Sequence, residues 1–447
     1  MANSPVISKQ AEPASINKLV IFSNKDNGKT SSDIANGISQ FQYYESIMQD
    51  CIRATVIFGD TGNAVNGKTV FEGLPLVGTE RVELELVDNN DQKLKLTLYV
   101  NKATPLSDSS TKGLFSLDLV SKEFILNEKS RLNKRFDGRI SDHVRSALTS
   151  GGRNGLETKK KINIEETSNN YNFFGNNKKP YYTINWLSKM AVSAQNQKSG
   201  ESAGYFFFET SEGFNFKSID GLLAQKQKKS VMYNDSPDRQ KVPAGYDMKA
   251  LEFERDNRVN VQRKFEMGAF STRIVTFDPF SCVYNVDTLT AEEKKKSLKL
   301  AGKDLPKFNE EFDSPDQKKE FSRTTYYLLD TGTLPSGSSS QQIEKSAEQN
   351  AQIKKTINQS IMRYNQLYSS SVTITTAADL SLHAGDAIYV DSPELSRDTK
   401  NDTVDKQTGG IYIISDMCHH YTATGTFTQL KLVRDSSGRK GNHTKRN

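Results

Sequence analysis

The sequence has few cysteines, no long apolar run and no marked excess of either charge. Three cysteines, Cys51, Cys282 and Cys418, occur without a CxxC pair, which argues against a disulfide framework. Apolar runs end after about five residues, as at residues 54–58, whereas a helix that spans a membrane needs about 20. The amino terminus is polar and lacks the basic start and apolar stretch of a secretion signal. These absences predict a protein that folds in a reducing cytosol and has no membrane partner.

Charge and hydrophobic content are both modest for the length of the chain. The 60 basic residues exceed the 54 acidic residues by 6, and a dedicated nucleic-acid binder concentrates its basic residues more strongly. Hydrophobic residues occupy 35% of the 447 positions, which is below the usual globular share. A chain of this length exceeds one ordinary core, so we expect about three domains, each with a modest core.

The amino-terminal part of the chain has the pattern of an antiparallel sheet. Apolar and polar residues alternate over residues 81–87 and 93–100, as a sheet with one solvated face requires. Residues 88–92 between these runs are turn formers and predict a hairpin. Glutamates of the first run would face lysines of the second, which favours this pairing. We expect a β-barrel over residues 17–126, with strands near residues 270–286 as candidates to complete it.

The remainder of the chain mixes helical and strand patterns. Ser141 is expected to cap a helix that starts there, and residues 248–267 have mostly helical propensity. Residues 341–370 predict a long helix with one narrow apolar stripe, which is typical of a helix that lies against one partner surface without being enclosed. Strand patterns return over residues 371–435.

Together these patterns predict an α+β, β-rich fold of several parts. The expected parts are a disordered arm at 1–16, a first β-barrel domain at 17–126, an α+β insert at 127–224, a mixed helical and strand connecting region at 225–340, a long helix at 341–370, a β-domain that forms part of a second barrel at 371–435, and a basic tail at 436–447.

One literal phosphate-loop motif, G-x-x-x-x-G-K-[ST], occurs at Gly62–Thr69. Such a loop needs a helix that opens at the Lys-Thr pair, so that the helix N-terminus faces the anion. Gly73 and Pro75 follow within two turns and would break that helix, and the surrounding hairpins are not alternating strand–helix units. We interpret the segment as a loop between strands, with a nucleotide site as the alternative.

Two Asp-Thr-Gly copies, Asp60-Thr61-Gly62 and Asp330-Thr331-Gly332, invite comparison with aspartic proteases. Those enzymes hold two such carboxylates face to face, where they share a proton. The first copy enters a loop rich in Asn and Gly, and the second enters a segment rich in Pro, Ser and Gly. Because Asp and Gly are turn formers, turns account for both copies, and the protease reading stays as an alternative.

Asp416, Cys418, His419 and His420 have the composition of a metal site but not its spacing. Neighbours on a strand point to opposite faces, so the two histidines cannot readily share one ion. His383 is the other nearby candidate. We interpret this segment as a strand end or turn with polar residues at an interface, and we assign no metal ligand.

Lysine clusters and an aromatic group are the remaining candidates for binding. Lysines gather at residues 159–161, 226–229 and 294–296, each within a polar stretch that is typical of a solvated surface, although nucleic acid is an alternative partner. An aromatic group interleaved with Asn and Lys could stack a base or a sugar, but domain packing or a subunit contact is its more ordinary role. This group comprises Tyr171, Phe173, Phe174, Tyr181 and Tyr182.

A longer pattern runs through the second half of the chain. The segment at 382–390 leads through a polar loop to residues 409–414 and then to the final strand at 424–435. Before it lie an aromatic strand that continues into F-x-F-x-S-I-D, at 204–220, and the run R-I-V-T-F-D-P at 273–279. Over about residues 200–430, this pattern resembles the baseplate hub proteins of contractile-tailed bacteriophages. The amino-terminal β-domain matches that family only in style.

The resemblance implies a structural virion protein without catalytic, cofactor-binding or metal residues. Hubs of this family are homotrimers in which each subunit contributes two tube-protein-like β-barrels, so that three subunits form a pseudo-sixfold ring. The ring connects a hexameric tail tube to a trimeric central spike, contacts other baseplate subunits, and lets DNA pass through its lumen. The implied location is the tail baseplate, after synthesis in the host cytoplasm.

Two other classes stay open. One is another tube or spike component of a tail or secretion machine. The other is an enzyme: a nucleotide hydrolase through Gly62–Thr69, a protease through the two Asp-Thr-Gly copies, or a virion-borne glycan hydrolase. A glycan hydrolase needs two placed carboxylates in a cleft, and 54 acidic residues do not single out a pair.

Overall fold

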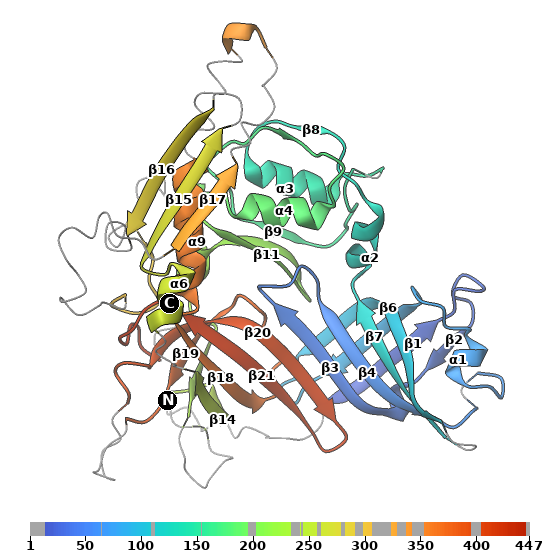
Figure 1. The fold of residues 1–447 in the computed structure, drawn as a ribbon. Helices are drawn as coiled ribbons and strands as arrows, with labels where there is room; N and C mark the ends of the chain where they lie inside the picture. Colours follow the sequence, from blue (N-terminus) through green and yellow to red (C-terminus); the bar gives the residue numbers. More distant parts are fainter. Residues whose placement is uncertain are drawn as a thin grey trace.

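The computed structural model is rich in β-strand, and most of its strands belong to one long sheet (Figure 1). No helix in the part of the chain that the structure describes is long and apolar enough to cross a membrane. That part comprises residues 14–63, 65–108, 112–152, 154–194, 203–233, 242, 245–256, 261–278, 282–290, 298–305, 323–328, 337–341, 353–394 and 404–443. Several predicted features lie outside it, namely most of the arm at 1–16, the lysines at 294–296, the second Asp-Thr-Gly at 330–332, residues 342–352 of the long helix and the last four residues.

Six strands close into a barrel, in the order β19-β13-β14-β18-β21-β20 with β20 pairing back to β19. They come from two separated parts of the chain: β13 (Lys229–Met232), β14 (Met248–Asp256), β18 (Ser370–Ala377), β19 (Ala387–Asp391), β20 (Gly410–Thr422) and β21 (Gly425–Arg434). Strand β13 pairs in parallel with both of its neighbours, so the barrel is not purely antiparallel. The prediction of helix over residues 248–267 is wrong for its first half, because residues 248–256 form a barrel strand.

Seven further strands continue the same sheet into the amino-terminal part of the chain. They follow β20 in the order β3 (Ile38–Ser46), β4 (Arg53–Asp60), β7 (Gly113–Val120), β6 (Lys93–Asp108), β5 (Arg81–Val87), β1 (Ser15–Phe22) and β2 (Ser31–Asp33). The short helix η1 (Ala35–Gly37) contacts both β1 and β4. At Gly37 a Cβ would lie 2.7 Å from the carbonyl oxygen of Gly59, so this close approach requires glycine. We call these seven strands the amino-terminal β unit.

The strands of the amino-terminal β unit pair and bury their side chains as the alternating sequence pattern predicts. Strands β5 and β6 form the predicted hairpin, and Glu85 stands opposite Lys95 with an ion pair of 3.0 Å. Residues Val82, Leu84 and Leu86 point inward and are almost fully buried. Their cluster extends without a break into the barrel, so the two β units share one hydrophobic core.

Both ends of the described chain contact the barrel. The backbone N–H of Ala14 donates to Thr426 Oγ1 at 2.7 Å, and β1 begins at the next residue, so the expected arm ends before residue 14. Near the other end, Arg439 forms an ion pair of 2.8 Å with the buried Asp391. Residues 436–443 therefore pack on the barrel and are not a free tail.

A helix-containing insert lies above the place where the two β units meet (Figure 1). It comprises α2 (Lys122–Lys129), β8 (Arg135–Phe136), α3 (Ile140–Thr149), β9 (Ile162–Ile164), β10 (Phe173–Phe174), α4 (Pro180–Ser188), β11 (Tyr205–Thr210), β12 (Gly213–Ser218) and α5 (Ile219–Leu223). The prediction that Ser141 caps α3 is wrong, because Arg139 occupies the N-cap position. The Ser141 hydroxyl instead donates to Glu166 at 3.0 Å.

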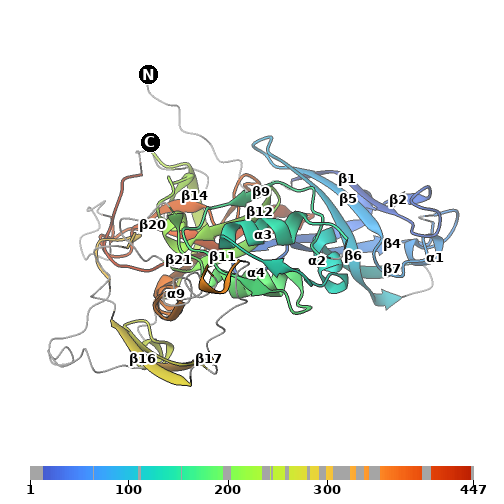
Figure 2. The same ribbon diagram turned by 90° about the horizontal axis from the view of Figure 1, so that it is seen from above.

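A separate three-stranded sheet projects from the two β units (Figures 1 and 2). Its order is β16 (Val283–Thr290), β15 (Ser271–Asp278) and β17 (Arg323–Leu328). The proposal that strands near residues 270–286 complete the first barrel is therefore wrong, because they pair with each other and with β17. One face packs on the long helix through Ile274, while the other exposes large apolar side chains, among them Tyr284, Tyr326 and Leu328.

The long helix, α9 (Ile353–Leu367), is enclosed, against the prediction from its narrow stripe. It contacts β15 and β16, the insert through α5, the barrel through β21, and the short helix α6 (Val261–Met267). Its polar residues are buried with hydrogen-bond partners: Asn358 with Thr272, and Gln366 with the carbonyl of Ala269. The prediction considered only the apolar side chains of the helix. The amide side chains of Asn358 and Gln366 are buried as well, so the helix has a wider buried surface than its apolar stripe.

Candidate functional site

The phosphate-loop motif lies between β4 and the one-turn helix α1 (Val70–Gly73). The buried Asp60 carboxylate already accepts the backbone N–H groups of Gly62, at 2.8 Å, and of Val70, at 2.6 Å. Thr69 caps α1 by accepting from the N–H of Glu72. A phosphate would need such free N–H groups at a longer helix, and here a carboxylate of the chain itself occupies them. The geometry supports a structural loop.

The same contacts give Asp60 of the first Asp-Thr-Gly copy a structural role. Each of its two carboxylate oxygens accepts a backbone N–H within ten residues of the chain. The proposed second copy, Asp330-Thr331-Gly332, lies outside the described residues. No pairing of the two carboxylates is therefore part of the described structure.

The candidate metal ligands at residues 416–420 contact different partners and do not converge on one point. His419 is buried, stacks on Tyr43 with ring centroids 6.0 Å apart, and its Nδ1 lies 2.9 Å from Thr428 Oγ1. Burial lowers the pKa of His419 to about 4. His420 lies on the other face, with Nε2 3.0 Å from the Gln40 amide. Asp416 accepts a hydrogen bond from Ser46 at 2.6 Å, and burial raises the pKa of Cys418 to about 11. Within the described ranges, no three His, Cys, Asp or Glu residues are placed to hold a metal ion.

Three lysines of the described clusters form ion pairs with carboxylates. Lys160 lies 2.8 Å from Glu123 and 2.5 Å from the buried Glu209. Lys228 pairs with Asp386 at 2.8 Å, and the lysine after it lies 3.4 Å from Asp379. These lysines join different segments of the chain, a role that competes with nucleic-acid binding.

The aromatic group is mostly the core of the insert. Phe173 stacks on Phe136 at 4.7 Å and meets Trp186 edge-on, while Tyr171 and Tyr181 are also buried. Phe174 and Tyr182 stay exposed at 41% and 58%. Domain packing therefore accounts for most of the group.

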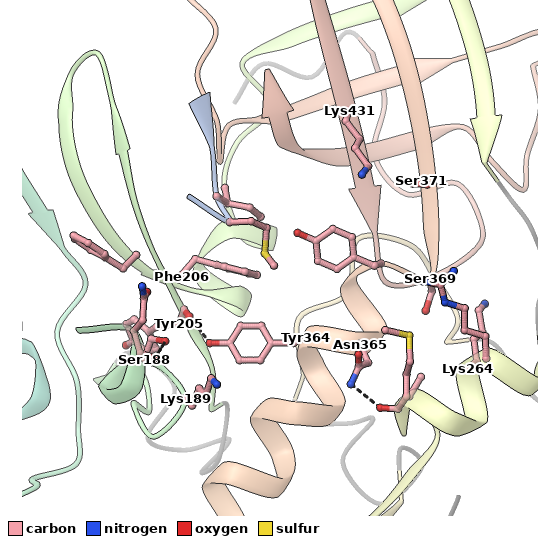
Figure 3. Close-up of a pocket in the computed structure, with 18 residues that line it drawn as sticks. Ser188, Lys189, Tyr205, Phe206, Lys264, Tyr364, Asn365, Ser369, Ser371 and Lys431 are labelled. Carbon is pink, nitrogen blue, oxygen red and sulfur yellow. Dashed lines mark hydrogen bonds between the residues drawn. The ribbon is translucent and has the colours of Figure 1, made fainter. Parts of the chain in front are cut away.

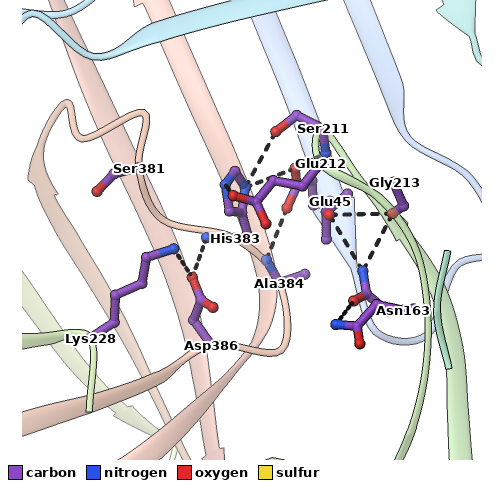
Figure 4. Close-up of polar contacts among 12 residues, drawn as sticks. Glu45, Asn163, Ser211, Glu212, Gly213, Lys228, Ser381, His383, Ala384 and Asp386 are labelled. Carbon is purple, nitrogen blue, oxygen red and sulfur yellow. Dashed lines mark hydrogen bonds and ion pairs between the residues drawn. The ribbon is translucent and has the colours of Figure 1, made fainter. Parts of the chain in front are cut away.

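A buried carboxylate that the sequence analysis missed joins three parts of the molecule (Figure 4). Glu45 on β3 accepts the backbone N–H of Ser211, in the turn between β11 and β12, at 2.8 Å. It also accepts the N–H of Ala384, in the loop before β19, at 2.9 Å. Tyr43 donates its hydroxyl at 2.7 Å, and His383 Nδ1 lies 3.3 Å away. Glu45 thus ties the amino-terminal β unit to the insert and to the barrel.

The ionisation of this junction follows from its geometry. Burial alone would raise the pKa of Glu45, but the contacts with His383, Ser211 and Tyr43 lower it. Burial would lower the pKa of His383, and the hydrogen bond and charge of Glu45 raise it. Ser211 Oγ and Glu45 both approach the same nitrogen of His383, at 3.4 and 3.3 Å. A nucleophilic relay needs the two ring nitrogens for different partners, so this cluster fits an ion pair better than a triad.

A second buried charge cluster is centred on α9. Arg363 is fully buried and forms ion pairs with Asp220 of α5 at 2.9 Å and with Asp435, just after β21, at 3.0 Å. It also donates to the carbonyl of Lys299 at 3.0 Å. The cluster joins the helix, the insert and the barrel. Its sequence signal was weak, because an arginine in a polar helix is typical of a solvated face.

The molecule also has a cavity of about 750 Å³ between the insert, α6, α9 and the barrel (Figure 3). Tyr364 crosses it and donates its hydroxyl to the carbonyl of Tyr205, and Phe206 meets the Tyr364 ring edge-on at 5.1 Å. Asn365 donates to the carbonyl of Met267 at 2.6 Å. This cavity is the main candidate for binding another molecule.

Comparison of the sequence finds no matching family model and no matching curated protein. Comparison of the structure finds the tail protein from Neisseria meningitidis MC58, with a TM-score of 0.50 and 9% identity, covering 94% of this chain and 96% of that one. The 43 kDa tail protein of prophage MuSo2 from Shewanella oneidensis is similar at a TM-score of 0.49 and 8% identity, covering 94% and 98%. An E. coli component of the type VI secretion system is similar at 0.41 and 9%, covering 92% and 77%. The match to the Neisseria meningitidis protein, with its TM-score of 0.50, shows that the chain has the fold of that tail protein.

Proposed function

We propose that this protein is a structural component of a phage tail, and that it acts as a homotrimeric baseplate hub. Three copies would form a pseudo-sixfold ring between a hexameric tail tube and a trimeric central spike. Other baseplate subunits would contact its outer surface, and DNA would only pass through the lumen. The protein would be made in the host cytoplasm and reside in the virion tail.

One observation carries the proposal: two β units of one chain lie side by side in a single continuous sheet (Figure 1). Strands β3 and β20 pair over seven residue pairs, from Gln40 with Thr422 to Ser46 with Asp416. A chain with two such units supplies six units per three copies, which suits an adaptor between sixfold and threefold neighbours. Closed assembly also removes exposed sheet edges, the main hazard of β-rich chains. The likeness of fold to a tail protein supports the same class.

The geometry of the candidate groups favours a structural role over catalysis. Asp60 is committed to backbone N–H groups of its own loop, and His383 is committed to Glu45. In the part of the chain that the structure describes, the histidines and carboxylates singled out above hold segments of the fold together. A ring component needs such internal ties, whereas a catalytic group must reach a substrate.

The test is the mass and the projected shape of the assembled protein. Native mass measurement should give a trimer of the 50.0 kDa chain, and end-on electron-microscope images should show threefold order around a central hole. A monomer at all accessible concentrations, with no such projection in particles or in isolated baseplates, would overturn the hub. ATP or GTP binding that disappears on Lys68→Ala would favour the nucleotide hydrolase instead.

A further inference from the structure

The cavity beside α9 combines an apolar interior with a basic rim. Its interior includes Phe206 and Tyr364, which are in edge-on contact, and Met48 and Met267 stand exposed at 63% and 41% along its lining. Such a surface is suited to one large apolar side chain, because methionine and aromatic groups adapt to it and bury its area. At about 750 Å³ the cavity has the size of a site for a small ligand or for a few side chains of a peptide.

The charged residues of the lining are all of one sign. Among its described residues the lining has Lys189, Arg263, Lys264 and Lys431, and it has no Asp or Glu. The whole chain carries 60 basic and 54 acidic residues, so a lining with four of one kind and none of the other departs from the average. Figure 3 shows Lys189, Lys264 and Lys431 on different sides of Tyr364, with the three lysines provided by the insert, α6 and β21.

Two of these lysines have no carboxylate partner among the residues that the structure describes. Within the described structure, no carboxylate forms an ion pair with Lys189 or Lys264, whereas Lys431 has Asp416 at 4.0 Å. Lys264 is half-buried, and burial lowers its pKa. A cation that is partly desolvated and unpaired is stabilised by a carboxylate from another molecule, since a charge-assisted hydrogen bond is stronger than a neutral one.

We propose that this cavity binds an acidic segment of a partner protein, with one aromatic or large aliphatic side chain packed against Tyr364 and the exposed Met48, and with carboxylates on Lys189 and Lys264. Charge complementarity selects this occupant over a basic or neutral peptide. The apolar interior of the cavity favours a peptide over a nucleic-acid backbone, which would contact the charged rim and leave the apolar surface uncovered. The inference does not depend on the trimer and concerns a different surface from the β3–β20 pairing.

The test uses the full chain and a fluorescent peptide of glutamates around one central tryptophan. This peptide should bind at low salt, while its glutamine counterpart and its version with alanine in place of tryptophan should bind at least about tenfold more weakly. The double variant Lys189→Gln, Lys264→Gln should lower the affinity by about tenfold, because it removes the two cations that are proposed to bind the carboxylates of the peptide. Met48→Glu, at an exposed position of the lining, should abolish binding without affecting the fold.

A matched control removes two lysines elsewhere. Lys122→Gln with Lys161→Gln changes the net charge equally at two exposed positions outside the cavity, and it should leave the affinity within about twofold. Equal loss with the control, or no binding of the acidic peptide, would overturn the proposal. Single-stranded DNA that binds more tightly than the peptide and is lost with the same cavity variants would replace the peptide by nucleic acid. A change of oligomeric mass with Met48→Glu would make a second copy of this chain the occupant.

Discussion

The two β units use buried charge in different ways. In the amino-terminal β unit two buried carboxylates, Asp60 and Glu80, act locally and accept backbone N–H groups within ten residues of the chain, whereas Glu45 accepts an N–H group from the barrel. Around the barrel the buried charges join distant segments. Arg363 forms ion pairs with Asp220 and Asp435, which lie 143 and 72 positions away from it in the sequence. The amino-terminal β unit is built from one stretch of the chain, residues 15–120, whereas the barrel is assembled from separated parts of the chain. Buried charges with distant partners are therefore concentrated around the barrel and at its junction with the amino-terminal β unit.

The largest expected effect comes from breaking the long-range cluster. Arg363→Gln would leave Asp220 and Asp435 as buried carboxylates without their counter-ion, and such a loss typically costs about 3–5 kcal/mol. We expect a clear fall in the urea midpoint of the barrel and of the insert. Arg145→Gln is the control, because its ion pairs with Asp142 and Glu166 are solvent-exposed and contribute less than about 1 kcal/mol. Equal effects of the two variants would contradict the comparison.

A smaller and local effect is expected from Asp60→Ala in the amino-terminal β unit. The N–H groups of Gly62 and Val70 would lose their acceptor, and an unsatisfied buried donor costs about 1–3 kcal/mol. Hydrogen exchange should show lost protection in residues 60–74, with the barrel unchanged. If protection fell equally in the barrel, the role of Asp60 would be long-range, and the difference between the two units would disappear.

The smallest expected effect is a pH dependence of the free energy of unfolding, which arises at the junction of Glu45 and His383. Because the pKa of His383 is raised on folding, its contribution to folding stability is complete below pH 6.5, the ordinary pKa of histidine. This contribution is lost as the pH rises through the pKa of His383 in the folded protein. The lowered pKa of Glu45 means that its contribution is present above the ordinary value of 4.5 and is lost as the pH falls through the folded value. The pair should therefore stabilise most between these two pH values.

His383→Gln measures this contribution directly. The difference in urea midpoint between the variant and the unchanged protein should be larger at pH 5.5 than at pH 8.5. His419→Gln is the matched control, since the buried His419 is neutral at both values, its pKa being lowered to about 4. A difference that does not vary with pH would show that His383 contributes through packing and neutral hydrogen bonds alone.

The sequence predicted what depends on neighbours along the chain. Alternation gave the hairpin of β5 and β6 and the inward positions of β5, because a period of two follows from the geometry of one strand. The alternation pattern could not predict which strands pair with β14. The residues of β14 have helical propensity, yet they form a barrel strand between β13 and β18. Strand pairing across more than a hundred residues is decided by packing that a local pattern does not contain.

Of the two buried charge clusters, only the one around Glu45 left a signal in the sequence. Glu45 continues the inward series of Phe41 and Tyr43 on β3, so an ionisable group at an inward position could have been noticed. Arg363 gave no such signal, because the polar residues of α9 have the composition of an exposed helix although most are buried. Its role appears only when Asp220 and Asp435 are brought to it by the fold.

The ladder between β3 and β20 has a mechanical consequence. Hydrogen bonds of an antiparallel pair run perpendicular to the strands, so a force that pulls the two units apart along the strand direction loads all the bonds of the ladder at once. Such shear loading resists rupture far better than peeling, in which bonds break one after another. A sudden push transmitted along the strands would therefore move the two β units together, because their relative displacement would require the whole ladder to break at once.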